Sequence, residues 1–501
     1  MALARNALFN LMGAALPAVL SVLTIPYIVR SLGTADFGLL TLVTAIVGYF
    51  ALLDVNLTAG TTKYVAGFHA TADANALHQT VTFGLAIYVG IGLAGMAGLL
   101  LFAEPLVRHV FSVPADRQTN AVLAVQVASI GFLFGQMQAY LQSLPGAMMR
   151  YDVSGRIEAA FGTAVPLCTV ALLALGGDLV GVVALRVVMS AVQLMVLVFA
   201  LRRLVPRFRP TWPPQALRAQ LLGFSAYAFL SKLASLTHSN ADKLLIGHHL
   251  GVAAVTFYAV PSTLTSRVMG LVSRLSGVMF PHASAMAAAG RIDDLRRHYF
   301  LGTRYLFFIN GAIALILVAF AQPLLTLWIG PEFAQQGAQV MILVALAQWV
   351  DSWTNLPSLV NDGLGHPRVT GTLALVRAVF GLLLIFIGLQ QFGIVGAAAG
   401  HLAASLTMGT VFLVYVHGRT VPVVLGDLLR QTVVSPLIIL FVMSCIGVLL
   451  APFVTSWFRL IGVFVPLIAL VIAVAWRFVV MPDHRRQLRG LLPWNRAGAD
   501  Q

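Results

Sequence analysis

Residues 8–29, with the sequence LFNLMGAALPAVLSVLTIPYIV, contain no charged side chain. A helix of about 20 apolar residues is long enough to cross the hydrocarbon core of a bilayer. The run is longer than the apolar core of a signal peptide, so we interpret it as a true transmembrane helix. Comparable runs predict an all-α polytopic membrane protein with about 14 transmembrane helices. The predicted spans are roughly 8–29, 38–60, 80–102, 120–142, 157–176, 179–201, 221–241, 251–280, 304–327, 337–360, 369–388, 394–416, 431–451 and 460–480.

The composition excludes several other classes of protein. Of the 501 residues, 59% are hydrophobic and only 10% are charged, and the mean hydropathy is +0.90. A soluble domain carries about 25% charged residues, so a soluble enzyme, a secreted disulfide scaffold and a disordered protein are excluded. Cys168 and Cys445 both lie in apolar runs, which favours buried thiols over a disulfide or a metal site.

The distribution of basic residues predicts the orientation of the chain. The formal net charge is +14. When the N-terminus is placed in the cytoplasm, most lysines and arginines outside the spans fall in cytoplasmic segments, as the positive-inside rule requires. The exceptions, in external segments, are Arg30, Arg108, Arg117 and Arg459. Both termini are therefore expected in the cytoplasm, and the basic charge needs no nucleic acid partner.

The chain also repeats itself. Leu32-Gly33 recurs as Leu250-Gly251, residues 102–106 (FAEPL) recur as residues 320–324 (FAQPL), and residues 179–181 (LVG) match residues 394–396 (IVG). Three matches in order at a nearly constant offset predict two parallel six-helix repeats, as in many transporters whose substrate site lies between the halves. The predicted organisation is an N-lobe at 1–201, a basic cytoplasmic linker at 202–220, a C-lobe at 221–418, and two extra helices with a basic tail at 419–501.

The opening of the chain resembles a known family. Residues 25–33 (IPYIVRSLG), followed by Phe37-Gly38, are similar to the start of the bacterial polysaccharide transporters. These are the Wzx-type oligosaccharide flippases of the multidrug/oligosaccharidyl-lipid/polysaccharide superfamily. Weaker similarities are Asp242-Lys243 with Gly247, Gly251 and Tyr258, and residues 361–367 (NDGLGHP). One departure is Thr256, where glycine is expected before the aromatic pair, and we expect a helix-packing contact there.

Charged residues inside the spans give an independent indication of the substrate. A charge at the bilayer centre costs roughly 2.5–3.5 kcal/mol even on the lenient insertion scale. The intramembrane cations outnumber the anions, which favours a hydrated cavity for an anionic ligand, and arginine forks suit phosphate oxygens. Lys243 could instead pair locally with Asp242, and Arg377 and Arg186 lie nearer span ends. The predicted substrate-binding cations, strongest first, are Arg267, Arg274, Lys232, Arg377, Arg186 and Lys243.

Polar side chains at helical spacing predict the cavity lining, although helix–helix packing would also explain serine and threonine stripes. The predicted lining residues are Asn6, Asn10, Ser21, Thr24, Gln348 and Asn355. Two acids, Asp54 and Asp351, are candidates for proton or ion coupling or for a structural hydrogen bond. No metal ligand spacing and no phosphate-cradling loop is found in the sequence, so no cofactor is expected beyond H⁺ or Na⁺.

The resemblance implies translocation of undecaprenyl-diphosphate-linked oligosaccharide units across the bacterial inner membrane, by alternating access. Expected partners are this glycolipid, the bilayer, and a polysaccharide polymerase and glycosyltransferases. A cation-coupled multidrug exporter and a peptidoglycan-precursor flippase of the same superfamily are the alternatives. An integral-membrane enzyme is disfavoured, because the external connections are too short for a catalytic domain.

Overall fold

The computed structural model describes residues 2–50, 57–205, 208–219, 221, 240–276, 279–481 and 485. These residues form helices and connecting turns, with no strand among them. Nine helices in the described part are long and apolar enough to cross a membrane. Large apolar side chains such as Phe441, Leu449 and Phe458 lie exposed on outer faces, as expected for a protein surrounded by lipid. An all-α membrane fold is therefore confirmed, whereas the count of fourteen spans stays a prediction.

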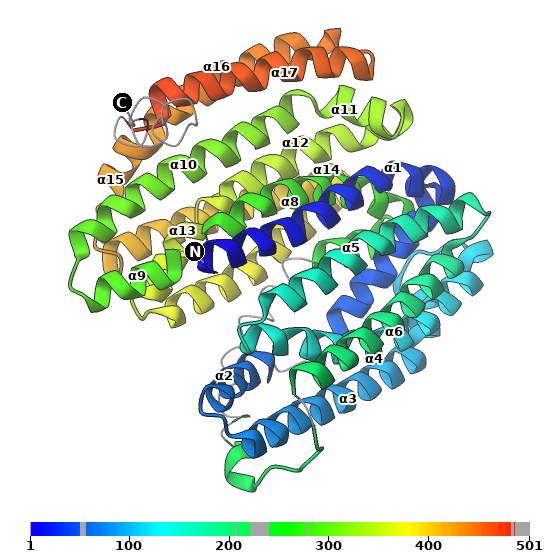
Figure 1. Cartoon of the computed structure of the whole chain (residues 1–501). Helices are drawn as coiled ribbons and strands as arrows, with labels where there is room; N and C mark the ends of the chain where they lie inside the picture. Colours follow the sequence, from blue (N-terminus) through cyan, green and yellow to red (C-terminus); the bar gives the residue numbers. More distant parts are fainter. Residues whose placement is uncertain are drawn as a thin grey trace, which may run out of the picture. The chain divides into compact units, whose positions relative to one another are not determined.

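The helices follow one another with short connections (Figure 1). In the first half they are α1 (Ala2–Phe50), α2 (Leu57–Ala70), α3 (Ala74–Pro105), α4 (Gln118–Ala147), α5 (Tyr151–Ala174) and α6 (Leu179–Leu204). In the second half they are α8 (Val252–Ser276), α9 (Met279–Ala288), α10 (Ile292–Ala319), α11 (Ala321–Trp328), α12 (Pro331–Ser352), α13 (Asn355–Gly363) and α14 (Pro367–Arg419). The chain ends with α15 (Leu425–Leu428), the π-helical turn η4 (Leu429–Val433), α16 (Val434–Leu450), α17 (Trp457–Val474) and the π-helical turn η6 (Ala475–Val479).

The two longest helices each contain a break. α1 is interrupted at Gly33 (φ 77°) and α14 at Phe392 and Gly393 (φ 59°). A Cβ on Gly396 would overlap the carbonyl oxygen of Gly388, so α14 folds back on itself as a tight helical hairpin. The two arms of this hairpin correspond to the predicted spans at 369–388 and 394–416.

Several predicted spans differ in detail from the helices. α10 begins at Ile292, well before the predicted start at 304, because its first turns are charged and hydropathy does not detect them. The span predicted at 304–327 is divided between α10 and α11 at Phe320. The span predicted at 337–360 is divided between α12 and α13 at Trp353 and Thr354. Most of the span predicted at 221–241 lies outside the described residues.

The repeat is present in the backbone. α3 and α10 begin at Ala74 and Ile292, and α2 and α9 end at Ala70 and Ala288, in both cases 218 positions apart. Residues with positive φ, which end helices and form tight turns, recur in the same way at offsets of 216 to 218. The pairs are Gly33 and Gly251, Ala72 and Gly290, Met149 and Gly365, and Gly176 and Gly393.

Equivalent residues of the two halves also meet each other. A Cβ on Gly38 would overlap the carbonyl oxygen of Val252 and lie 3.0 Å from Thr256 Oγ1. In turn, Thr256 Oγ1 donates a hydrogen bond to Thr34 O over 2.6 Å. Gly38 is equivalent to Thr256, and Thr34 to Val252, so the contacts are reciprocal as at a two-fold axis. The structure confirms Thr256 as a helix-packing contact between α1 and α8.

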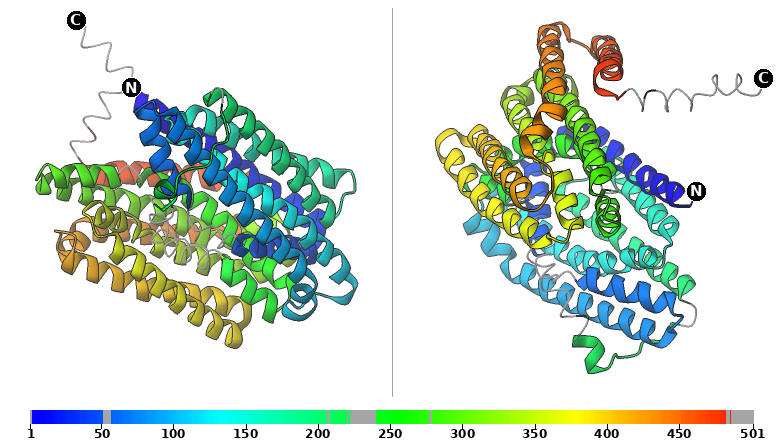
Figure 2. Two further views of the ribbon diagram at one scale, coloured as in Figure 1. Left: turned by 90° about the horizontal axis from the view of Figure 1, so that it is seen from below. Right: turned by 90° about the vertical axis from the view of Figure 1, so that its left-hand side faces the viewer.

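The chain divides into two compact units. The first comprises Met1–Thr263 with Ala374–Gly400, and the second Leu264–Leu373 with His401–Gln501. In the first unit α1 packs against α5, and α4 against α3 and α6. In the second unit α10 packs against α12 and α16, and α16 lies beside α17 (Figures 1 and 2). These units are defined by contacts, and the lobe boundaries inferred from the repeat stay a prediction.

Candidate functional site

Arg186 is an intramembrane cation of the first unit. It lies two turns into α6, and its Nη1 donates a hydrogen bond to Thr44 Oγ1 of α1 over 3.4 Å. The side chain of Thr44 is exposed, and its hydroxyl donates to Leu40 O over 2.7 Å. Within the described ranges Arg186 forms no ion pair with a carboxylate. Its charge is therefore not neutralised by any carboxylate of the described residues.

Lys243 of the first unit has its charge neutralised locally. Lys243 Nζ lies 3.2 Å from Asp242 Oδ1, and the two side chains are only 16% and 8% exposed. The backbone N–H of Lys243 donates to the same carboxylate oxygen over 2.8 Å. Of the two roles considered for Lys243, the structure shows the local pair, which makes it the weaker candidate for binding substrate.

Two hydroxyls of the predicted polar face of the first helix form hydrogen bonds within the helix. Ser21 Oγ donates to Ala18 O over 2.8 Å and Thr24 Oγ1 donates to Leu20 O over 2.9 Å. Hydroxyls bonded to their own backbone need neither water nor ligand, which favours a packing role for these two residues. Asn6 and Asn10 lie on α1, but their side chains are outside the described part of the structure, as are Asp54 and Lys232 entirely.

Arg267 and Arg274 lie on one continuous helix, α8. Seven residues are nearly two turns, so the two positions share a face about 10 Å apart along the axis. The side chain of Arg267, in the second unit, is exposed, and it forms no ion pair with any described carboxylate. The side chain of Arg274 is outside the described part of the structure. Arg377 lies half-buried on α14, in the first unit.

Asp351 is joined by a residue to which the sequence alone assigned no role. His401 Nε2 of α14 lies 3.5 Å from Asp351 Oδ2 of α12, and their side chains are 9% and 14% exposed. Ser405, one turn along α14 from His401, is also buried. A signal was present in the sequence, since a histidine inside an apolar span is a functional candidate by itself. Because α12 ends at Ser352, half-buried Gln348 shares a helix with Asp351, whereas half-buried Asn355 belongs to α13.

The sites thus consist of exposed or weakly bonded arginines and one buried carboxylate–imidazole pair. Arginines without a carboxylate can bind phosphate through paired N–H donors. A buried aspartate next to a histidine inside the membrane is a candidate site for a proton or a cation. Among the described residues no cluster of three or more metal-ligating side chains is found.

Comparison with known proteins adds to this geometry. Residues 27–336 match the family model described as polysaccharide biosynthesis protein. A putative O-antigen transporter of Shigella flexneri is 19% identical over 79% of this chain and 94% of its own length. A probable flippase, AglR of Haloferax volcanii, is 23% identical over 77% of this chain and 78% of its own length.

Solved structures share the fold. An inward-facing multidrug resistance transporter of the MATE family superposes with a TM-score of 0.66, at 16% identity, over 85% of this chain and 99% of that one. A transporter of the same superfamily from Pyrococcus furiosus superposes with a TM-score of 0.59 at 15% identity, over 84% of this chain and 95% of that one. It is described as having a binding pocket of reverse polarity. At such identities the likeness concerns the fold alone.

Proposed function

The chain belongs to the polysaccharide biosynthesis protein family, and we propose that it is a flippase for lipid-linked oligosaccharides. The proposed substrate is an undecaprenyl-diphosphate-linked repeat unit, moved across the bacterial inner membrane by alternating access for O-antigen, capsule or exopolysaccharide synthesis. The names of two relatives, a putative O-antigen transporter and a probable flippase, support this proposal. Glycosyltransferases would supply the substrate and a polymerase would consume it.

The observation that carries the proposal is the state of the intramembrane arginines. Arg186 has a single hydrogen bond, to Thr44, and Arg267 is exposed, and neither pairs with a described carboxylate. A diphosphate that must cross an apolar layer needs cations to replace its hydration, and arginine suits phosphate oxygens geometrically. We therefore assign Arg267, with Arg274 on the same helix of the second unit, to the diphosphate rather than to the sugar. Arg186, in the first unit, is a second candidate that the export assay tests by itself.

The main alternative is a cation-coupled multidrug exporter, and the MATE fold accommodates it equally well. A site for cationic drugs needs carboxylates that face the cavity. Two described carboxylates of the predicted membrane region are instead paired, Asp242 with Lys243 and Asp351 with His401. This pairing favours the anionic substrate. A flippase for the peptidoglycan precursor would use the same chemistry and is distinguished by substrate alone.

The Asp351–His401 pair is our proposed coupling site. Binding of H⁺ or Na⁺ by a buried carboxylate changes the charge of the site without any nucleotide, and no phosphate-cradling loop is found in the sequence. Transport driven by this pair would collapse when the ion gradient is dissipated. Transport by purified protein that required ATP and nothing else would contradict the proposal.

The test is export of surface polysaccharide in a strain that lacks its own copy of the gene. We expect Arg186→Ala, and the double variant Arg267→Ala, Arg274→Ala, to lower export by about 10-fold or more, since a charge-assisted hydrogen bond contributes roughly 1.5–3 kcal/mol. The Arg→Lys variants should keep partial activity, because charge remains and the fork is lost.

Arg108→Ala is the matched control, because Arg108 forms an exposed ion pair with Glu104 at the end of α3 (3.0 Å). Immunoblots report abundance in every strain. Normal export by a well-expressed double variant at Arg267 and Arg274 would refute the diphosphate assignment.

A further inference from the structure

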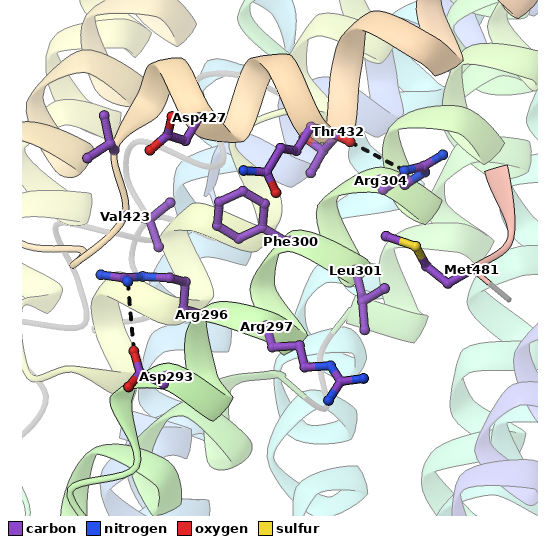
Figure 3. A pocket seen from close by; sticks show the side chains of 12 residues that line it. Asp293, Arg296, Arg297, Phe300, Leu301, Arg304, Val423, Asp427, Thr432 and Met481 are labelled. Atoms are coloured by element: carbon purple, nitrogen blue, oxygen red, sulfur yellow. Dashed lines mark hydrogen bonds and ion pairs between the residues drawn. The ribbon is translucent and has the colours of Figure 1, made fainter. Parts of the chain in front are cut away.

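A cavity of about 490 Å³ lies in the second unit, and its lining residues do not include the intramembrane arginines discussed above. Three elements form it: the first three turns of α10, the segment of α15 and η4 above them, and the chain just after η6 (Figure 3). Pockets of roughly 300–1,000 Å³ are of the size that binds small molecules. The residues that line it include Asp293, Arg296, Arg297, Phe300, Arg304 and Asp427.

The cavity lies where the elements that form it change from polar to apolar. α10 begins with residues 292–304 (IDDLRRHYFLGTR) and continues with residues 305–319 (YLFFINGAIALILVA). Residues 425–431 (LGDLLRQ) likewise precede the apolar α16, and η6 closes the last span at Val479. The polar ends of three spans thus line one cavity, and the ends of membrane spans lie among the lipid headgroups. By the predicted orientation it is the cytoplasmic surface.

Arginines of α10 dominate the wall of the cavity. Arg296 lies 3.7 Å from Asp293 and donates to Pro422 O over 3.0 Å. Arg304 donates to Phe478 O over 2.6 Å and to Gln431 O over 3.4 Å. These bonds fix the guanidinium groups on the wall rather than leaving them free in solvent.

Two features suggest an anionic occupant. Arg304 Nε is buried without a hydrogen-bond partner in the described part of the structure, and such a donor costs free energy unless a ligand accepts from it. Arg297 adds a second, exposed guanidinium about two turns away on α10. Three arginines face two aspartates, so the lining carries a net positive charge.

The rest of the lining matches a lipid rather than a free anion. Phe300 lies in the middle of the wall, between Arg296 and Arg304 (Figure 3). Leu301, Val423 and Met481 complete an apolar surface beside the arginines. Asp427 is exposed opposite them and can accept a hydrogen bond from a headgroup hydroxyl. A phosphate, a hydroxyl and an apolar stem are the three parts of an anionic phospholipid such as phosphatidylglycerol.

We propose that this cavity binds the headgroup of an anionic phospholipid, with its phosphate on Arg304 Nε and Arg297. Basic pockets between transmembrane helices on the cytoplasmic side are the sites where such headgroups bind. The occupant would tie α10 to α15 and η4, and so attach the two extra spans to the rest of the second unit. This proposal concerns binding alone and does not depend on the transported substrate.

The test uses the full-length protein in mild detergent, with thermal unfolding and native mass spectrometry as measurements. We expect added phosphatidylglycerol to raise the unfolding temperature and to remain bound, more than phosphatidylcholine or phosphatidylethanolamine does. Arg297→Gln and Arg304→Lys should each weaken apparent lipid affinity by about 10-fold, the size of one charge-assisted hydrogen bond. Arg304→Lys keeps the charge, so the loss would report the hydrogen-bond donors of the guanidinium group rather than its charge.

Arg291→Gln is the matched control, because Arg291 lies at the same end of α10, pairs with Asp294 over 2.7 Å and does not line the cavity. Equal loss in this control would show general surface attraction and overturn the proposal. A shift as large with inorganic phosphate, or with farnesyl diphosphate, would assign the site to another phosphate source. Unchanged phosphatidylglycerol binding by both cavity variants would also overturn it.

Discussion

The starts of α3 and α10 occupy equivalent positions in the two halves, 218 residues apart, and their surroundings differ. At the start of α3, His78 packs edge-on against Phe208 (5.5 Å), Phe83 packs against Trp212 (5.7 Å), and Thr211 N donates to Thr82 Oγ1. The linker between the halves thus covers this helix with aromatic side chains.

At the start of α10, Arg296 stands at the position of His78 and Arg304 at that of Ala86. The covering segment is α15 with η4, and it encloses a charged cavity instead of an aromatic contact. Duplication therefore preserved the course of the backbone, while the segment that follows each half determined the chemistry at its polar end. Exchanges of residues between equivalent positions test this view directly.

The largest effect is expected at the crossing of α1 and α8, where the halves meet. Gly38→Val places a side chain on the Val252 backbone, which cannot yield as a flexible side chain would. Overpacking costs roughly 1–3 kcal/mol and more where backbone must move, so we expect little folded protein. Thr256→Val at the equivalent position removes only the hydrogen bond to Thr34 O, about 1 kcal/mol. Size-exclusion profiles and unfolding temperatures measure both, and equal stability of the two variants would contradict the reciprocal crossing.

An intermediate effect is expected for Arg304→Ala. This change leaves Phe478 O and Gln431 O without their donor and separates the last span end from α10. We expect the free energy of unfolding to fall by about 1.5–3 kcal/mol. Arg291→Ala, which loses an exposed ion pair, should fall by ~1 kcal/mol or less. Thermal unfolding of the lipid-free protein measures the stability of both variants. If both are as stable as the unaltered protein, the proposed difference between the two halves is wrong.

The smallest effect is expected from transferring a charge to the first half. His78→Arg imitates Arg296 but keeps the cover of Phe208 and Trp212. We expect no gain of phosphatidylglycerol binding by native mass spectrometry, since a cation without a cavity adds only screened surface attraction. Specific retention of the lipid at this position would show that charge alone suffices and that the covering segment is unimportant.

Much of the fold could be predicted from the sequence because the bilayer fixes the length of an apolar helix. The repeat was visible at Leu32-Gly33 and Leu250-Gly251, since a positive φ restricts these positions to few residue types. The breaks at Phe320 and Trp353 were missed because both sides remain apolar, and hydropathy does not register a change of direction.

The candidate site could be predicted less completely. Arg267 and Arg274 share α8 as expected, because seven residues are two turns of any helix. The partner of Asp351 could not be assigned, since His401 is distant in sequence and only tertiary packing brings α12 and α14 together. The cavity beside α10 could not be predicted, because it also needs residues after 420, which are distant in sequence from the arginines of α10.

The turn at Phe392 and Gly393 has a consequence for biosynthesis. Residues 386–400 contain no charged side chain, and the backbones of the two arms of α14 approach each other closely at Gly388 and Gly396. Nothing in this turn can retain the first arm on one side of the membrane while the second is being synthesised. The arms would therefore leave the translocon laterally as a preassembled pair, and the orientation of that pair would be decided at its distant ends, by Arg368 and Arg377 on one arm and Arg419 on the other.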